Sequence, residues 1–268
     1  MKLKSFSQIL QESIKKNKSQ LCVGLDIDPD RISLKSNYSI NSLKNITKKL
    51  IDQTIENVVA YKLNLAFFEV FGSKGYKWLE ETIKYIDGKK LLIGDGKRGD
   101  IGNTTNKYAN SLFDHFGFDA ITVSPYMGQD SILPFIKYKN KGIFVLCLTS
   151  NPSARDIQLK DASGLSVFRR VISMVRDIDD NKNLGLVIGA TKPEQIADIR
   201  LEAGDLPFLI PGIGAQGGNL EESLLAGNNE NGLAIINVSR SIIYSKDPSF
   251  SSRDYNEKIN RIFSLNVF

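Results

Sequence analysis

The segment Leu91–Asp100 reads LLIGDGKRGD, a short apolar run that passes directly into charged residues and glycines. Seven further apolar runs, rich in β-branched residues, recur along the chain, separated by longer stretches with helical spacing. A run that is apolar at nearly every position is typical of a strand buried on both faces, as parallel strands are when helices cover them. The eight predicted strands are Leu21–Asp26, Val58–Phe67, Leu91–Asp95, Ala120–Ser124, Gly142–Leu148, Leu184–Ala190, Pro207–Pro211 and Leu233–Val238.

The stretches between these strands predict helices. Apolar residues recur at helical spacing in Lys77–Ile86, Leu165–Ile178 and Glu257–Phe263, and a further helix begins at Pro193 and stops at Gly204. Strand–helix alternation that repeats eight times along the chain favours an α/β fold, a (β/α)₈ TIM barrel, over an open sheet.

An extra helix is expected before the first strand, because Phe6, Ile9, Leu10 and Ile14 share one face of the first twenty residues. This stretch lacks the continuous apolar core and the cleavage site of a signal peptide. No apolar run reaches the roughly 20 residues of a membrane helix, so we expect no membrane partner. Since no linker rich in Ser, Gly and Pro divides the chain, we expect one barrel domain over residues 1–268.

The composition is that of a soluble globular protein, with 41% apolar and 24% charged residues. Lys and Arg number 35 against 30 Asp and Glu, and the net charge of +5 admits nucleic-acid binding as an alternative. The basic residues are spread along the chain, however, and an anionic small molecule explains the charge equally well. We therefore expect no nucleic-acid partner.

Few residues are available for metal or redox chemistry. Cys22 and Cys147 lie inside apolar runs, so we expect both to be buried and reduced, as in a cytoplasmic protein. The one histidine, His115, lies in a helical stretch, which is a poor context for a Ser-His-Asp triad, so we expect it to cap a helix or to lie on the surface. A single histidine also excludes most zinc sites, so we expect no metal.

Charged residues stand at the predicted strand ends, where barrels of this type carry their sites. Asp95 and Lys97 are two residues apart, so they point to the same face of a strand, and Lys62 on the neighbouring strand can reach them. Asp100 completes an alternating cluster of lysines and aspartates. Carboxylates beside Lys97 would keep its ammonium group charged and in place, so the pattern indicates a proton donor.

A glycine-rich loop, Pro211–Gly218, follows the seventh predicted strand. It formally matches G-x-G-x-x-G, but a dinucleotide fingerprint normally opens the first βαβ unit. The loops after strands seven and eight of a barrel commonly bind phosphate, because glycine amides can approach an anion closely. Gln216 and Arg240 can add donors to the same anion, so we predict a phosphate site.

Two further strand ends keep alternative interpretations. Asp26 is either a cap for a helix after the first strand or an acceptor for sugar hydroxyls. The Thr149–Pro152 loop after the fifth strand is either a plain turn or a source of hydroxyl and amide groups for a heterocycle.

With these motifs the chain resembles the orotidine 5′-phosphate decarboxylase family, most closely its longer, type 2 branch. Asp95–Thr104 (DGKRGDIGNT) is similar to the family's D-x-K-x-x-D-I-x-x-T, and Pro211–Gly218 and Val238–Ile242 match its phosphate-binding elements. The resemblance implies conversion of orotidine 5′-monophosphate to uridine 5′-monophosphate and CO₂ in de novo pyrimidine biosynthesis. It implies electrostatic stabilisation of the transition state, without a metal or other cofactor.

The resemblance also assigns roles to single residues. Lys97 would protonate the pyrimidine carbon that loses CO₂, with Asp95 and Lys62 in the charged network beside it. Asp26 and Lys62 would bind ribose hydroxyls, and Ser150 would contact the pyrimidine.

The remaining roles concern the phosphate and a neighbouring subunit. Gln216 and Arg240 would hold the phosphate. Asp100, Ile101 and Thr104 would enter the site of the second subunit of a homodimer. Whether the protein associates with orotate phosphoribosyltransferase stays open.

Two other functions have a discriminating test. A barrel of the hexulose-phosphate synthase type uses a similar D-x-K-x-x-D but needs magnesium, so activity that survives a chelator decides against it. A basic nucleic-acid-binding protein would show affinity that falls steeply with salt.

Overall fold

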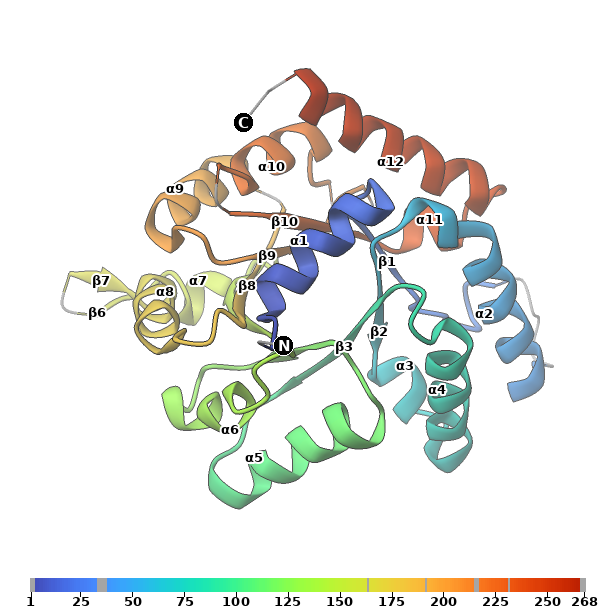
Figure 1. Cartoon of the computed structure of the whole chain (residues 1–268), viewed down its shortest axis with the longest axis horizontal. Helices are drawn as coiled ribbons and strands as arrows, with labels where there is room; N and C mark the ends of the chain where they lie inside the picture. The colour runs from blue at the N-terminus through green and yellow to red at the C-terminus, as the bar shows by residue number, and fades with distance from the viewer. Residues whose placement is uncertain are drawn as a thin grey trace.

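The computed structural model describes residues 3–32, 38–162, 164–190, 192–214, 217–230 and 232–265. Eight parallel strands close into a barrel in the order β1-β2-β3-β4-β5-β8-β9-β10, and β10 pairs back with β1 (Figure 1). The predicted α/β fold, a (β/α)₈ TIM barrel, is confirmed. The strands are β1 (Leu21–Gly24), β2 (Ala60–Asn64), β3 (Leu91–Arg98), β4 (Ala120–Val123), β5 (Gly142–Leu148), β8 (Leu184–Ile188), β9 (Phe208–Pro211) and β10 (Ala234–Val238).

Each predicted strand is present, and the bounds differ most where the chain leaves the barrel. The predicted run Val58–Phe67 changes from strand to helix, because Asn64 Oδ1 accepts a hydrogen bond from the Ala66 N–H (3.2 Å) and α3 (Ala66–Glu69) begins there. An apolar run by itself does not distinguish a buried strand from a buried helix. β3, in contrast, continues past its predicted end at Asp95.

Helices surround the barrel (Figure 1). The predicted helices around residues 77–86 and 193–204 are present as α4 and α9, and the predicted Glu257–Phe263 is part of the longer α12. The first residues of the predicted Leu165–Ile178 instead form β7, which pairs with β6. The further elements are α2 (Ile40–Thr54), α4 (Gly72–Ile86), α5 (Gly102–Ala109), α6 (Leu133–Ile136), α7 (Ala154–Ile157), β6 (Asp161–Ala162), β7 (Leu165–Ser166), α8 (Val167–Ile178), α9 (Pro193–Ala203), α10 (Leu220–Gly227), α11 (Arg240–Ile243) and α12 (Pro248–Leu265), with short 3₁₀ or π turns at Ile55–Asn57, Asn110–His115 and Gln129–Ser131.

The predicted N-terminal helix, α1 (Phe6–Asn17), lies across the amino end of the barrel, in the centre of Figure 1. Phe6 and Leu10 are buried among the side chains that fill the barrel interior. The Phe6 ring packs edge-on against Phe144, with ring centroids 5.9 Å apart. The bare backbone of Gly142 leaves the space that this ring occupies. Side chains therefore fill the amino end of the barrel.

The predictions for cysteine and histidine are confirmed. Cys22 and Cys147 are free and buried, and burial raises the pKa of the Cys22 thiol to about 12. His115 lies on the surface, with its Nε2 3.1 Å from Glu80 Oε1. Within the described ranges, no helix has the length and apolar character needed to cross a membrane.

Candidate active site

A cavity of about 340 Å³ opens at the carboxyl ends of the barrel strands. Its lining comes from all eight barrel strands or the loops directly after them, as the architecture predicts. The predicted site residues that line it are Asp26, Lys62, Asp95, Lys97, Ser150, Pro211 and Arg240.

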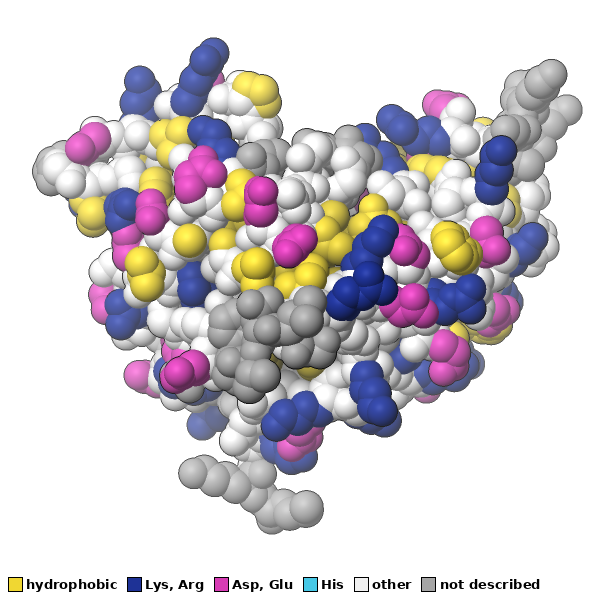
Figure 2. All heavy atoms as spheres, turned by 90° about the horizontal axis from the view of Figure 1, so that it is seen from above, with side chains coloured by type: hydrophobic (Ala, Val, Ile, Leu, Met, Phe, Trp, Pro, Cys, Tyr) yellow, Lys and Arg dark blue, Asp and Glu magenta, His cyan; other side chains and the backbone are white. Residues whose placement is uncertain are grey.

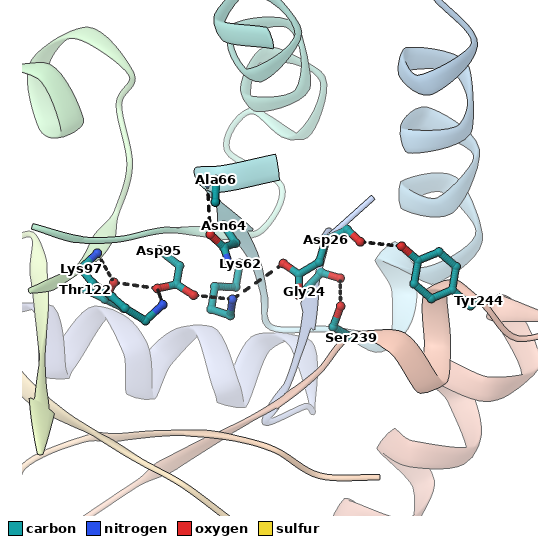
Figure 3. Close-up of polar contacts among 10 residues, drawn as sticks. All are labelled: Gly24, Asp26, Lys62, Asn64, Ala66, Asp95, Lys97, Thr122, Ser239 and Tyr244. Carbon is teal, nitrogen blue, oxygen red and sulfur yellow. Dashed lines mark hydrogen bonds and ion pairs between the residues drawn. The ribbon is translucent and has the colours of Figure 1, made fainter. Parts of the chain in front are cut away.

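A row of alternating charges crosses this cavity (Figure 3). Lys97 Nζ lies 2.6 Å from Asp95 Oδ1, and Lys62 Nζ lies 2.7 Å from Asp95 Oδ2. On its other side Lys62 Nζ lies 4.0 Å from Asp26 Oδ1. The four residues come from β3, β2 and the end of β1, which are neighbours in the barrel, so residues distant in sequence meet here.

Burial and ion pairing act in opposite directions on this row. Burial raises the pKa of Asp95, but Lys62 and Lys97 outweigh it and hold the pKa well below its usual range. Burial lowers the pKa of Lys62, but Asp95 and Asp26 outweigh it and the pKa is raised. Both groups are therefore charged at neutral pH, although both are almost fully buried. The Lys97 side chain is 47% exposed and is the most accessible of the four charges in this row.

Asp95 and Lys97 meet at a bulge, not by the regular alternation that their spacing predicted. The register of β3 against β4 shifts between Gly94 and Arg98, and within this bulge Lys97 has a φ of 46°, in the left-handed region. Thr122 of β4 lies opposite the bulge. Its Oγ1 accepts a hydrogen bond from the Lys97 N–H (3.0 Å) and donates one to Asp95 Oδ1 (2.8 Å).

Three polar residues of the cavity were missed by the sequence analysis: Asn64, Thr122 and Asn237. Asn237 is 6% exposed, and its Oδ1 has no hydrogen-bond partner among the described residues. Each of the three interrupts a mostly apolar strand near its carboxyl end. That interruption is the signal that identifies them. A polar side chain buried without a hydrogen bond costs free energy, so in a strand buried on both faces it indicates a position that faces a site.

The predicted phosphate loop follows β9 and lies near Arg240, since both line the same cavity. Gly212 and Gly214 have φ values of 106° and 74°, which glycine adopts without strain, so the chain can turn sharply after Pro211. No described residue pairs with the Arg240 guanidinium. Gln216 lies outside the described residues, so its contact with a phosphate stays a prediction.

The geometry of Asp26 favours the acceptor over the helix cap. Its Oδ1 is buried, faces Lys62 and lacks a hydrogen-bond partner in the described part of the chain. The backbone around it is held by Tyr244, whose hydroxyl donates to the Asp26 carbonyl (2.7 Å) and accepts from the Asp28 N–H (2.8 Å). The Asp26 carboxylate is therefore available to a ligand.

The loop after β5 presents hydroxyl and amide groups to the cavity through Thr149, Ser150 and Asn151. Gln158 Oε1 accepts a hydrogen bond from the Thr149 N–H (2.8 Å) and so ties the loop to the chain after α7. Across the cavity wall, Gly189 lies too close to the Ser150 backbone to carry a side chain. Since three of its polar residues line the cavity, the geometry favours a loop that offers hydroxyl and amide groups over a plain turn, and contact with a heterocycle stays a prediction.

Asp100, Ile101 and Thr104 are absent from the lining of this cavity. They lie after β3 and at the start of α5, and Ile101 is 50% exposed. Asp100 Oδ1 accepts a hydrogen bond from the Ile101 N–H (2.8 Å). The structure does not bring these residues into the site of their own chain, and their entry into a second subunit's site stays a prediction.

Comparison with known proteins adds independent findings. The model of the orotidine 5′-phosphate decarboxylase / HUMPS family matches residues 19–255. An orotidine 5′-phosphate decarboxylase of Dehalococcoides mccartyi is 44% identical over 249 residues, which are 91% of this chain and 90% of that protein. The corresponding protein of Flavobacterium johnsoniae is 41% identical over 94% of both chains.

Solved structures agree with these relatives. The Leishmania donovani OMP decarboxylase superposes with a TM-score of 0.87 at 39% identity and covers 96% of this chain and 98% of its own. The Leishmania donovani UMP synthase superposes with a TM-score of 0.89 at 41% identity, and the match covers 97% of this chain but 57% of the synthase. The chain belongs to the orotidine 5′-phosphate decarboxylase / HUMPS family.

Proposed function

We propose that this protein is a carboxy-lyase that converts orotidine 5′-monophosphate to uridine 5′-monophosphate and CO₂ in pyrimidine biosynthesis. The observation that carries the proposal is the charged row from Lys97 through Asp95 and Lys62 to Asp26, set in a cavity that Arg240 also lines. Relatives that match nine tenths of the chain bear the name of this activity.

Lys97 carries the chemistry in this proposal. When the bond from pyrimidine C6 to the carboxyl carbon breaks, CO₂ leaves and the electron pair stays on C6, where no adjacent group can delocalise it. A fixed ammonium group stabilises that charge as it develops, and its proton then bonds to C6. The 2.6 Å contact with Asp95 holds the Lys97 ammonium in position.

The carboxylate of Asp95 has a second effect. A substrate carboxylate placed beside it would be repelled, and the repulsion ends when CO₂ leaves, so the barrier is lowered. Asp95 can act in this way because it remains charged despite its burial.

The other lining residues bind the parts of the substrate that do not react. Arg240, the glycine loop and Gln216 hold the phosphate, Asp26 and Lys62 bind ribose hydroxyls, and Ser150 contacts the pyrimidine. Binding energy at the remote phosphate can then be used to assemble the site around the reacting carbon.

The assembly and the setting are part of the proposal. The protein works as a homodimer in which Asp100, Ile101 and Thr104 complete the neighbouring subunit's site, and the exposed position of Ile101, just before α5, supports this. The buried, free cysteines support a reducing, cytoplasmic location. The Leishmania UMP synthase extends well beyond the part that matches this chain. We take that extra length as support for association with orotate phosphoribosyltransferase, and co-purification tests the association.

The charge distribution does not support the nucleic-acid alternative. On the face shown in Figure 2, Lys and Arg side chains are interspersed with Asp and Glu side chains. A nucleic-acid surface would gather basic residues along a stripe or patch.

The test is the loss of orotidine 5′-monophosphate absorbance in the presence of a metal chelator. We expect full turnover with chelator, because the lysine supplies both the charge and the proton. Activity that disappears with the chelator and returns with magnesium would support a synthase-type reaction instead.

Lys97→Ala should lower turnover by at least ~10³-fold, since both proton transfer and charge stabilisation are lost. Lys182→Ala is a matched control: Lys182 also has a left-handed backbone (φ 53°) and an aspartate partner, Asp205, at 3.3 Å, but lies next to α1 at the opposite end of the barrel. It should leave turnover unchanged.

A further inference from the structure

The register of β3 against β4 shifts around Lys97, so the strand is irregular at this residue. Here the Lys97 N–H donates to a side chain of β4, the Thr122 hydroxyl, at 3.0 Å. A lysine in the left-handed region is strained, and such a conformation persists where its surroundings hold it. Thr122 is the group on β4 that does so.

We propose that Thr122 is a positioning residue for decarboxylation, which holds the backbone of Lys97 and the carboxylate of Asp95 in one fixed arrangement. The inference rests on the proposed function. Thr122 is not among the site residues predicted from the sequence, and it acts on the reaction through Lys97 and Asp95.

The hydroxyl is suited to this role because it can accept and donate at the same time. It accepts from the Lys97 N–H and donates to Asp95 Oδ1, the same oxygen that lies 2.6 Å from Lys97 Nζ. A closed loop therefore runs from the Lys97 backbone through Thr122 and Asp95 to the Lys97 ammonium group. This loop fixes both ends of the lysine.

Burial makes the hydroxyl hard to replace. Thr122 is 2% exposed, so water cannot readily take over either hydrogen bond when the hydroxyl is removed. Valine has the same branched shape and would fill the same space on β4, but it can neither accept from Lys97 nor donate to Asp95. Serine keeps the hydroxyl and loses a methyl group.

The experiment compares Thr122→Val and Thr122→Ser with Thr82→Val. Thr82 is also buried, and its hydroxyl donates to the Trp78 carbonyl within α4, away from the cavity. We expect Thr122→Val to lower kcat by ~10–100-fold and to change KM by less than ~3-fold, because a displacement of the reacting group by about 1 Å costs that much. Thr122→Ser should recover most of the rate, and Thr82→Val should keep all of it.

A second readout needs no substrate. Exchange of the Lys97 amide hydrogen, followed by NMR of protein labelled at lysine, should accelerate in Thr122→Val and stay slow in Thr122→Ser. If wild-type protein does not release CO₂, the proposed function is wrong, and amide exchange still shows whether Thr122 holds Lys97. If wild-type protein is active, a Thr122→Val enzyme with unchanged kcat, or a Thr122→Ser enzyme as slow as Thr122→Val, overturns the positioning role.

Discussion

At the carboxyl end of the barrel, the buried carboxylate of Asp95 contacts two lysine ammonium groups, whereas at the amino end the buried carboxylate of Asp179 contacts two backbone N–H groups. The lysines hold the pKa of Asp95 well below its usual range. Burial raises the pKa of Asp179 to about 6, because backbone N–H groups compensate less than a full charge does. The same residue type therefore has opposite properties at the two ends.

The buried cations Lys62 and Arg200 also differ in their partners, a charged group at the carboxyl end and backbone at the amino end. Lys62 at the carboxyl end is paired with a carboxylate that itself faces the cavity. Arg200 in α9 instead donates to the backbone carbonyls of Gly204, Leu206 and Gly227, and stacks on the Phe208 ring at 3.4 Å. We infer that the buried titratable groups paired with one another at the carboxyl end serve a ligand, and that those paired with backbone at the amino end serve the fold. Predictions that separate the two ends test this distinction.

The largest effect on turnover is expected at the carboxyl end, in an experiment that mixes two inactive variant proteins. Lys97→Ala and Asp100→Ala should each be nearly inactive. In a mixed dimer one site receives both changes and the other receives neither. Random exchange at equal amounts makes half of the dimers mixed, so roughly a quarter of all sites should be intact. Assays before and after subunit exchange measure this recovery.

Mixed dimers must be shown to form, for example by a size tag on one variant. If they form and activity stays at the level of the single variants, Asp100 acts within its own chain, and the shared site is excluded.

Arg240→Ala should cost about 2–5 kcal/mol in transition-state binding, because an arginine that contacts phosphate in a closed site is desolvated. The measurement is kcat/KM for orotidine 5′-monophosphate. Arg31→Ala is a matched control, since Arg31 is more than half exposed and pairs with Asp28 at 3.6 Å. Equal kcat/KM values for Arg240→Ala and wild type would assign the phosphate to another group.

These predictions also mark what the sequence can reveal. The barrel followed from eight apolar runs, and most of the site followed from charged residues at their ends, because both patterns are local. The contribution of Thr122 was hidden, since it depends on a register shift between β3 and β4 that no spacing in either strand shows. The structure alone also separates Asp100 from the cavity that contains Asp95 and Lys97.

At the amino end we expect effects on stability and not on turnover. Arg200→Met should lower the free energy of unfolding by about 2–4 kcal/mol, because several buried carbonyls lose their donor. Arg176→Met removes an exposed arginine that donates to the Glu202 carbonyl (2.8 Å) and should change stability by less than ~0.5 kcal/mol. Denaturant unfolding measures both. If folded Arg200→Met loses kcat, the amino end also contributes to turnover, and the distinction between the two ends is wrong.

The smallest effect, and the only stabilising one, is expected for Asp179→Asn. The folded-state pKa of about 6 lies above the ordinary value of 3.8, so between these pH values the folded protein holds a proton that the unfolded chain has released. The free energy of unfolding therefore falls as the pH rises from about 4 to about 6. Asparagine keeps an oxygen that can accept from the Asn183 and Leu184 N–H groups but carries no buried charge.

Asp179→Asn should thus be more stable than wild type by about 1–2 kcal/mol at pH 7, and the difference should disappear near pH 4. Denaturant unfolding at both pH values measures it, with the exposed neighbour Asp180→Asn as a control that should change stability by less than ~0.5 kcal/mol at either pH. A less stable Asp179→Asn at pH 7 would mean that the two N–H groups need the charged carboxylate. The buried charge at the amino end would then favour folding in its ionised form, as it does at the carboxyl end.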